Sequence, residues 1–433
     1  MNKKEQHIVF LGIGGIGMSS IARHYLSIGT PVFGYDKVPS SLTDELIQEG
    51  AQITFDEDTT VYPGWAAEET TVIFTPAIPE RLKWLEFFAD FTIIKRAEAL
   101  GLLSNHKRCL AVAGTHGKTS TSAMLLHILT EAGEDPTGFI GGIMADTGTN
   151  YRLGRGPWVV VEADEFDRSF MHLRPEAAAV TTIDADHLDV YGSSRELRKT
   201  FEAFLSQVSG PTFTATSLSN THRVHTPEAP IRAEDIQPDD GVYIFNLIID
   251  GEKHRTRLRM PGAHNVYNAV LAASLANYAG ISGQSIARAL SSFRGIKRRF
   301  EFHSNKPVII EDYAHHPTEL NALLTSIEEL YPSKKTTLVF QPHLYTRTRD
   351  FMEAFQKELS KTAHTLILPI YPAREKPIPG ITSSALAKNI ERGEVISKEA
   401  LAKRVKELKP DVLLLVGAGD IGDLVASLKE ELT

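Results

Sequence analysis

The residues best suited to chemistry lie in one short motif, GTHGKT, at residues 114–119. The motif follows the apolar run Cys109 to Ala113, which predicts a β-strand, and precedes a helical pattern. A glycine-bounded turn between a strand and a helix points several backbone N–H groups at one spot, where a polyphosphate can bind. Lys118 adds a positive charge for the β- and γ-phosphates, and the Thr119 hydroxyl can ligate Mg²⁺. The motif therefore predicts a nucleoside-triphosphate site.

This phosphate loop, residues 114–119, is shorter than an ordinary P-loop. Only Thr115 and His116 separate Gly114 from Gly117, whereas the usual motif has four residues between its glycines. A glycine- and threonine-rich turn without a ligand is the alternative interpretation.

A second glycine turn, GIGGIG at residues 12–17, follows the first predicted strand and precedes a helical pattern. Asp36 ends the next predicted strand, where its carboxylate could reach a ribose hydroxyl, as in dinucleotide-binding folds. The same turn suits any nucleotide diphosphate, because a helix N-terminus recognises the pyrophosphate. Purely structural glycines remain the alternative.

Two further residues are candidate metal ligands. Glu162 ends the predicted strand in WVVVEAD, and His187 follows the next predicted strand. With the Thr119 hydroxyl they could surround Mg²⁺, which keeps water and substrate oxygens among its ligands. Each residue taken alone is more often structural. Zinc is disfavoured, because the chain has no H-E-x-x-H or C-x-x-C spacing.

Composition narrows the class of protein. The chain has 433 residues, which predicts two or three domains, and short β-branched runs alternate with helical patterns, as in α/β folds with parallel sheets. The net charge of -8 argues against nucleic-acid or anionic-membrane partners. The single cysteine, Cys109, excludes an internal disulfide, and no apolar stretch reaches the length of a membrane span. We therefore expect a cytoplasmic protein.

Three blocks of strands are expected, separated by the polar breaks SNHKR at 104–108 and RGIKRR at 294–299. The predicted strands of the three blocks are 7–12, 31–36, 71–75 and 91–95; then 109–113, 158–164, 178–183 and a hairpin over 242–260; then 307–311, 336–341, 365–370 and 412–416.

The motifs together resemble the Mur ligase family over essentially the whole chain. GTHGKT, EADEFD, DADHLD, HNVYN, RRFE, DYAHHPTE and QPHLYTRTRD occur in this order. The resemblance implies three domains: a Rossmann-like UDP-sugar domain at 1–104, a central P-loop-type ATPase domain at 105–298, and a Rossmann-like amino-acid domain at 299–433. It also implies that the first glycine turn holds a UDP pyrophosphate rather than NAD, which makes a dehydrogenase the weaker interpretation.

The family chemistry implied is ATP- and Mg²⁺-dependent amide formation through an acyl phosphate in peptidoglycan precursor synthesis. The resemblance is greatest to the branch that adds L-alanine to UDP-N-acetylmuramate. Lys118, Glu162, His187, His315 and Arg347 would be catalytic, with Thr119, Glu162 and His187 as metal ligands. The remaining implied contacts are, for ATP, Gly114, Thr115, His116, Gly117, Ser120, His264, Asn265, Asn268, Arg299 and Asp312; for the UDP-sugar, Gly12, Gly14, Gly15, Ile16, Gly17, Asp36, Thr75, Arg96, Asp167 and Ser169; and for the amino acid, Tyr313 and His343.

The chain departs from the family pattern at two places. Leu344 stands where an arginine usually follows the histidine of QPH, which leaves Arg347 or Arg349 to hold the substrate carboxylate. The segment TPAIPE at 75–80 also differs from the usual serine-rich strand end. Some relatives carry a carbamylated lysine; we expect none here, on Lys199 or elsewhere.

Several alternatives remain open. A recycling ligase would attach an intact murein tripeptide to the same UDP-sugar, and a folylpolyglutamate-type ligase would share the phosphate loop but not a UDP-binding block. A nicotinamide dehydrogenase or a non-catalytic nucleotide-binding module is more remote. The protein is expected to be a monomer or a homodimer.

Overall fold

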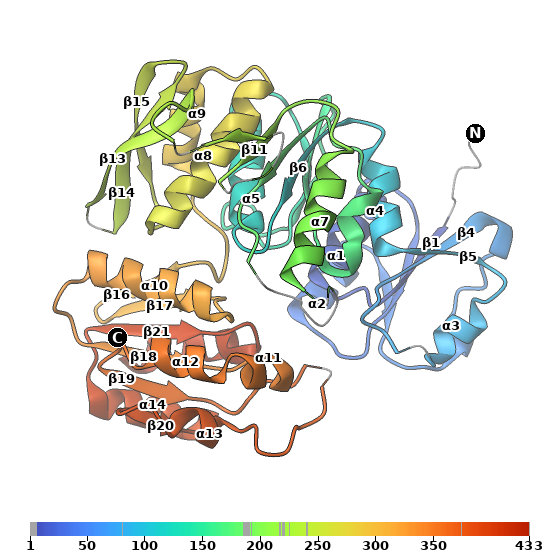
Figure 1. The fold of residues 1–433 in the computed structure, drawn as a ribbon. Helices are drawn as coiled ribbons and strands as arrows, with labels where there is room; N and C mark the ends of the chain where they lie inside the picture. The colour runs from blue at the N-terminus through green and yellow to red at the C-terminus, as the bar shows by residue number, and fades with distance from the viewer. Residues whose placement is uncertain are drawn as a thin grey trace. The chain divides into compact units, whose positions relative to one another are not determined.

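The computed structural model describes residues 7–79, 81–184, 191, 193–215, 218, 221–224, 226–239, 241–373 and 375–432 (Figure 1). The chain divides into two compact units. The first comprises Met1–Glu234, Phe245–Thr256 and Tyr267–Phe293, and the second comprises Asp235–Ile244, Arg257–Val266 and Arg294–Thr433.

The N-terminal block of the first unit is a parallel five-stranded sheet in the order β3-β2-β1-β4-β5. Its central strand has the sequence HIVFL, and Ile8 and Phe10 are completely buried because helices cover the sheet. The elements are β1 His7–Leu11, α1 Ile16–Ser27, β2 Val32–Tyr35, α2 Ser41–Gln48, β3 Gln52–Thr54, η1 Thr59–Val61, η2 Ala67–Glu69, β4 Thr70–Phe74, α3 Lys83–Phe87, β5 Thr92–Lys95 and α4 Arg96–Ser104.

The middle block is a seven-stranded sheet in the order β12-β11-β10-β6-β9-β7-β8. Strands β6 and β9 are buried along nearly their whole length, as expected for a parallel sheet covered on both faces. Only the edge pair β7 and β8 is antiparallel. The elements are β6 Arg108–Ala113, α5 Lys118–Glu131, β7 Thr137–Phe139, β8 Tyr151–Arg152, β9 Trp158–Glu162, η3 Phe166–His172, β10 Ala177–Val180, α7 Ser194–Leu205, β11 Thr212–Thr214 and β12 His222–Arg223.

A three-stranded sheet and two helices follow in the chain. The sheet has the order β13-β14-β15, and β14 and β15 are joined at Asp250 and Gly251, which both have positive φ. This is the hairpin expected near residues 242–260. The elements are β13 Ile231–Asp239, β14 Val242–Ile249, β15 Glu252–Leu258, α8 Ala263–Tyr278 and α9 Gly283–Ser292.

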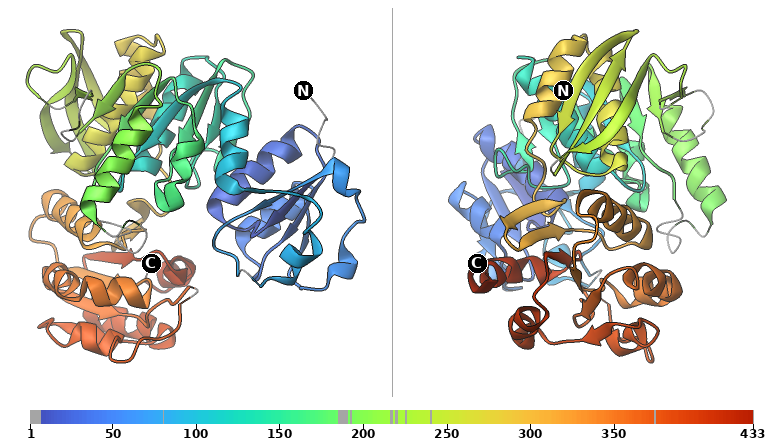
Figure 2. Two further views of the ribbon diagram at one scale, coloured as in Figure 1. Left: turned by 45° about the vertical axis from the view of Figure 1, so that its right-hand side comes forward. Right: turned by 90° about the vertical axis from the view of Figure 1, so that its left-hand side faces the viewer.

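The C-terminal sheet of the second unit has the order β16-β17-β21-β18-β19-β20, drawn in orange and red in Figure 2. All of its pairings are parallel except that of β16 with β17. The elements are β16 Glu301–Asn305, β17 Val308–Asp312, α10 Pro317–Leu330, β18 Thr336–Phe340, α11 Tyr345–Asp350, α12 Met352–Leu359, β19 His364–Ile367, α13 Ser383–Ala387, β20 Gly393–Val395, α14 Lys398–Leu408, β21 Val412–Val416, η4 Asp420–Leu424 and α15 Val425–Leu432. The predicted α/β class with parallel sheets is confirmed.

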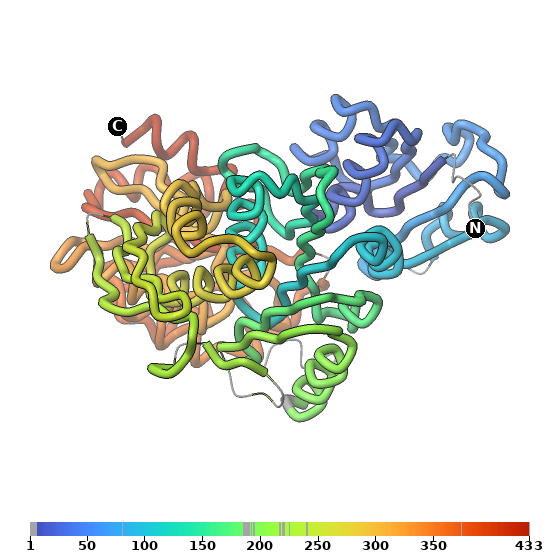
Figure 3. The backbone as a smooth tube through the Cα atoms, turned by 90° about the horizontal axis from the view of Figure 1, so that it is seen from above, coloured from blue at the N-terminus to red at the C-terminus, as the bar shows by residue number. Residues whose placement is uncertain are grey.

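Within the first unit, α1 of the N-terminal block packs against β7 and β8 of the middle block; Figure 3 shows the two blocks side by side. Asn150 is completely buried at this junction and donates to the Ile16 carbonyl at 2.6 Å and to the Ser19 hydroxyl at 3.0 Å. Its Oδ1 accepts from Arg23 at 2.6 Å. The nitrogen and the oxygen of this buried amide are both hydrogen-bonded, and these bonds fix the helix that follows the first glycine turn. Among the residues described, no helix has the length and apolar character to cross a bilayer.

Candidate functional site

The phosphate loop lies between the central strand β6 and helix α5 of the middle block. Gly114 has φ 131° and Gly117 has φ 84°, a region that side-chain-bearing residues rarely adopt. A Cβ at Gly114 would also clash with the Thr181 hydroxyl, and a Cβ at Gly117 would lie 2.6 Å from Asn268 Oδ1. Both glycines are therefore required by backbone conformation and by close packing.

Hydrogen bonds join the phosphate loop to the residues that follow β10. Thr115 donates its backbone N–H to the Thr182 carbonyl at 2.9 Å, and the His116 N–H is 3.1 Å from Thr182 Oγ1. The Asp184 N–H donates to Thr115 Oγ1 at 3.0 Å. Helix α5 begins at Lys118, so its first N–H groups, in the turn that contains Ser120, lie at the carboxyl edge of the sheet. Parallel sheets bind ligands at this edge.

Lys118 Nζ is surrounded by three acceptors. It lies 2.6 Å from the Gly114 carbonyl, 3.3 Å from the Thr115 carbonyl and 2.7 Å from Glu165 Oε2. Burial alone would lower the pKa of Lys118, but the nearby carboxylates, Glu165 foremost, raise it above its ordinary value. The loop therefore keeps a charged ammonium group.

Glu162 ends β9 beside the loop, as predicted. Its Oε1 accepts from the Thr119 hydroxyl at 3.0 Å, and its Oε2 accepts from the Gly141 N–H at 2.8 Å. A hydroxyl and a carboxylate this close offer the hard oxygen donors that Mg²⁺ prefers, so these residues fit the ion. The third predicted ligand, His187, lies outside the described residues.

The first glycine turn is built differently. Asp36 Oδ2 accepts from the Gly14 N–H at 2.7 Å, so the carboxylate at the end of β2 holds the turn itself. A Cβ at Gly12 would lie 2.7 Å from Thr75 Cγ2, and a Cβ at Gly17 would clash with the Arg96 guanidinium. Ile16 starts α1, with Gly15 as its N-cap. Three predicted UDP-sugar residues from outside the turn, Asp36, Thr75 and Arg96, thus lie against it.

Side chains of residues 162–167, which we call the acidic loop, make ion pairs beside both turns. Asp164 Oδ2 accepts from Arg96 at 2.8 Å, and Asp167 pairs with Lys95 at 3.1 Å. Asp167 and Arg168 both have positive φ, in the turn that also holds Ser169. Sequence reasoning assigned no role to Asp164 or Glu165; their place in EADEFD, directly after Glu162, was the available signal.

In the second unit, Asp312 ends β17 and accepts from the N–H groups of Phe300 at 2.7 Å and Ala314 at 2.8 Å. Burial raises its pKa to about 6, although the positive charge of Arg299 opposes the rise. The Arg299 guanidinium lies 5.1 Å from the Tyr313 ring centre. The unit therefore brings together three of its predicted site residues.

The predicted amino-acid site also assembles within the second unit. The rings of His315 and His343 are 6.1 Å apart, and Arg347 Nη1 lies 3.4 Å from His343 Nδ1. Burial lowers the pKa of His315. Leu344, the departure from the family pattern, has φ 73° and begins the turn into α11. Arg349 instead pairs with Asp350 at 2.7 Å and is half exposed, so Arg347 is the better placed arginine.

Helix α8 carries the predicted adenine-side residues. His264 is exposed in its first turn, and Asn265 donates to the Pro261 carbonyl at 2.7 Å. Asn268 lies against Gly117 of the phosphate loop. Asn268 is therefore the member of this group that the first unit places beside the loop.

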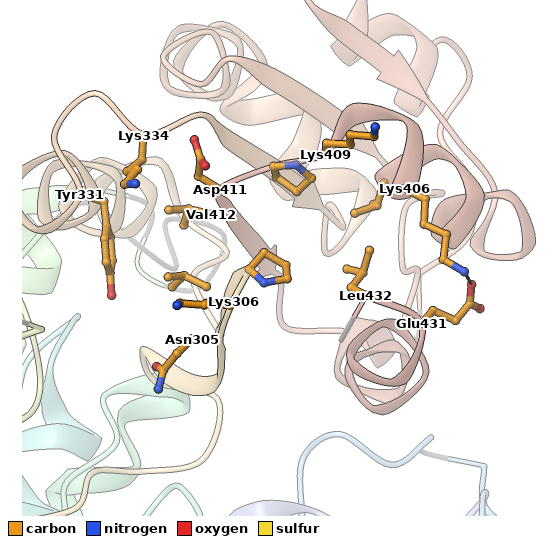
Figure 4. Close-up of a pocket in the computed structure, with 14 residues that line it drawn as sticks. Asn305, Lys306, Tyr331, Lys334, Lys406, Lys409, Asp411, Val412, Glu431 and Leu432 are labelled. Carbon is orange, nitrogen blue, oxygen red and sulfur yellow. Dashed lines mark ion pairs between the residues drawn. The ribbon is translucent and has the colours of Figure 1, made fainter.

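Two other features of the second unit lie apart from Asp312. A cavity of about 590 Å³ opens at the amino ends of β17 and β21, the edge of the sheet opposite Asp312, where Lys306, Lys334 and Lys409 are exposed (Figure 4). Glu301, His303 and Glu311 form a cluster of possible metal ligands, but Glu311 Oε1 is held by Arg298 at 2.7 Å. Neither feature contains a predicted site residue.

Three family models match the chain in succession. They are described as the Mur ligase catalytic domain at residues 7–108, the Mur ligase middle domain at 112–276 and the Mur ligase glutamate ligase domain at 298–419.

Curated relatives match over the full length. The chain is 44% identical to UDP-N-acetylmuramate--L-alanine ligase of Flavobacterium psychrophilum, covering 100% of this chain and 99% of the relative. It is 39% identical to the protein of the same name in Porphyromonas gingivalis, covering 99% of each. Among solved structures, UDP-N-acetylmuramate-alanine ligase of Thermotoga maritima matches with a TM-score of 0.83 at 28% identity, covering 98% of each chain. A murein peptide ligase of Psychrobacter arcticus shares the fold, with a TM-score of 0.73 at 22% identity, covering 99% of this chain and 98% of that one.

Proposed function

The chain belongs to the Mur ligase family, and we propose that it joins L-alanine to the lactyl carboxylate of UDP-N-acetylmuramate, converting ATP to ADP and phosphate. The observation that carries this proposal is the phosphate loop, where Lys118, Thr119 and Glu162 converge at the end of a parallel sheet. The names of the full-length relatives support the choice of sugar acid and amino acid.

The reaction proceeds in two steps. The muramate carboxylate attacks the γ-phosphorus of ATP, the bond to the β-phosphate oxygen breaks, and ADP leaves. The amine of L-alanine then attacks the acyl phosphate, loses a proton and expels inorganic phosphate, leaving an amide. No protein nucleophile is needed, so the protein contributes positioning and charge stabilisation.

Lys118 supplies the charge that the first step requires, because a carboxylate and a triphosphate repel each other. The N–H groups at the start of α5 bind phosphate oxygens. Mg²⁺ bound by Thr119 and Glu162, together with His187, would neutralise further phosphate charge. Excluding water protects the acyl phosphate from hydrolysis.

The substrates are assigned to separate elements. The turn at residues 12–17, with Arg96, binds the UDP pyrophosphate, and Asp167 and Ser169 lie on the loop that follows Glu162. His315, His343 and Arg347 receive the amino acid, Arg347 binding its carboxylate. Asn268 contacts the nucleotide beside Gly117. The family resemblance assigns His264, Asn265, Arg299 and Asp312 to the same nucleotide. We assign the UDP-sugar domain to residues 1–104, the ATP domain to 105–298 and the amino-acid domain to 299–433. We place the enzyme in the cytoplasm.

Phosphate release from ATP tests the proposal. We expect release that requires UDP-N-acetylmuramate, L-alanine and Mg²⁺ together, with the amide product identified by mass spectrometry. Release that requires the murein tripeptide instead of L-alanine would identify a recycling ligase, and nicotinamide reduction would identify a dehydrogenase. Absence of ATP consumption with every acceptor would refute the ligase function.

A further inference from the structure

Glu165 is a buried carboxylate to which the proposed chemistry assigns no task. Its side chain is fully buried, yet its Oε2 lies 2.7 Å from Lys118 Nζ, the cation of the phosphate loop. The loop segment before it is anchored on both sides, by Glu162 to Thr119 and by Asp164 to Arg96. Glu165 is therefore held in place at the point where a nucleotide phosphate would meet Lys118.

Glu165 and a nucleotide phosphate would compete for the N–H donors of Lys118. An ammonium group has three N–H donors, and here they face the carbonyls of Gly114 and Thr115 and the carboxylate of Glu165. The two carbonyls belong to the phosphate loop and are neutral, so Glu165 is the charged partner. A phosphate oxygen can gain a direct bond from Lys118 only by replacing one of these three acceptors, and only Glu165 lies outside the loop.

We infer that Glu165 is the resting counter-ion of Lys118, which the terminal phosphates of the nucleotide displace on binding. Glu165 is thus a positioning residue: it holds the lysine in the loop while the site is empty, and its charge opposes nucleotide binding. This inference rests on the proposed function, because it takes the phosphate loop to be the ATP site.

The surroundings of Glu165 support exchange of the charge. Burial raises the pKa of its carboxyl to about 7, with Lys118 opposing the rise and Asp164 adding to it. Tyr191 donates its hydroxyl to the Glu165 carbonyl, which fixes the backbone independently of the side chain. The side chain can therefore leave Lys118 while the hydrogen bond from Tyr191 keeps the loop backbone in place.

The test is a set of variants of the full-length protein titrated calorimetrically with Mg²⁺ and a non-hydrolysable ATP analogue. Glu165→Gln keeps the shape of the side chain but removes its charge. We expect about tenfold tighter binding of the analogue, the order of one lost charge interaction. We also expect a lower melting temperature without nucleotide and a larger rise when the analogue is added. A purely structural Glu165 would lower the melting temperature without tightening binding.

Three controls make the result specific. Glu176→Gln removes a carboxylate of the same unit that pairs with Arg108 at the amino ends of β6 and β10, so it should not change analogue affinity. In the Lys118→Ala background, Glu165→Gln should no longer tighten binding, because Glu165 acts through the lysine. If Glu165→Gln does not fold, Glu165→Asp, which shortens the side chain, should tighten binding in the same direction by a smaller factor.

The outcomes separate the inference from the proposed function. Unchanged or weaker binding by the folded Glu165 variants, with the wild type binding the analogue, overturns the counter-ion role and leaves the ligase function standing. A wild-type protein that does not bind the analogue refutes the ATP site itself.

Discussion

Two glycine turns in the first unit begin in the same way and differ in how they carry charge. Both follow a buried parallel strand and open a helix, at Ile16 and at Lys118. In the first turn, Asp36 bonds the Gly14 N–H and Arg96 packs over Gly17. In the second, the lysine is part of the loop itself. The first turn suits a pyrophosphate that is bound and never transferred, whereas the second suits a phosphate whose charge changes during reaction.

The acidic loop gives each turn its own counter-ion. Asp164 pairs at 2.8 Å with Arg96, which packs over the first turn, and Glu165 pairs at 2.7 Å with Lys118 of the second turn. The pKa of Asp164 lies below its ordinary value. Burial raises this pKa, but the positive charges of Arg96 and Lys118 together outweigh burial and lower it. Burial instead raises the pKa of Glu165. The two adjacent carboxyl groups therefore differ in how readily they ionise, which agrees with the displacement inferred for Glu165.

Lys118→Ala should have the largest effect and separates the two turns. Ligation should fall about 10³-fold or more, because the charge on the transferring phosphate loses its main protein partner. Binding of UDP-N-acetylmuramate, measured by calorimetry, should stay nearly unchanged, because the first turn does not use Lys118. Equal loss of both properties would contradict the division of labour.

Lys199→Ala is the matched control for Lys118→Ala. Lys199 lies on α7, is half exposed and pairs with Glu196 at 2.7 Å. The variant should keep wild-type activity, and the intact mass of the wild type should show no carbamate on this lysine. Loss of activity in this variant would revive the hypothesis of a carbamylated lysine.

Gly17→Ala should selectively damage the first turn. The new Cβ would displace the Arg96 guanidinium, so the affinity for UDP-N-acetylmuramate should fall about tenfold or more, while binding of an ATP analogue should change little. Gly15→Ala provides the comparison within the same turn, because its Cβ would meet the Gly12 carbonyl at an ordinary 3.5 Å. Equal effects of the two substitutions would exclude Arg96 as the cause.

Much of this arrangement could be predicted from sequence. The phosphate loop, the first glycine turn and the buried strands that precede them are local patterns, and the structure has β1, β6 and β9 within a few residues of the predicted bounds. The short strands β3, β7, β11 and β20 were not predicted, because three-residue segments carry too little periodicity to distinguish them from loops.

The missed contacts are those that join segments far apart in the chain. Nothing local to Asn150 or Arg23 shows that they meet across 127 residues, and nothing local to Glu165 shows that it faces Lys118. The packing of α1 against β7 and β8 brings Arg23 to Asn150, and the pairing of β6 with β9 brings Glu165 to Lys118. The roles that were assigned by family resemblance, such as Arg299 and His315, likewise depend on three-dimensional contacts that residue spacing alone does not specify.

Asn150→Ala should destabilise the support of the first turn rather than either binding site. The substitution leaves the Arg23 guanidinium and the Ile16 carbonyl without their buried partner, so we expect the free energy of unfolding to fall by about 2–3 kcal/mol. Asn321→Ala, which removes a surface hydrogen bond to Lys361, should change it by about 0.5 kcal/mol or less. Denaturant unfolding of both variants measures the difference, and equal losses would mean that Asn150 does not anchor α1.

A dependence of stability on pH is expected at the same junction. Burial, with the charge of Lys107, lowers the pKa of His24 to about 4, and its Nδ1 lies 2.8 Å from the Tyr151 hydroxyl. Below about pH 6.5 the unfolded chain binds a proton that folded His24 does not accept until about pH 4. Stability contributed by neutral His24 is therefore present above pH 6.5 and is lost progressively as the pH falls towards 4. His24→Gln should flatten the fall in melting temperature across this window, whereas His106→Gln, in the exposed turn before β6, should leave it unchanged. An identical pH profile for wild type and His24→Gln would show that the acid sensitivity arises at other residues.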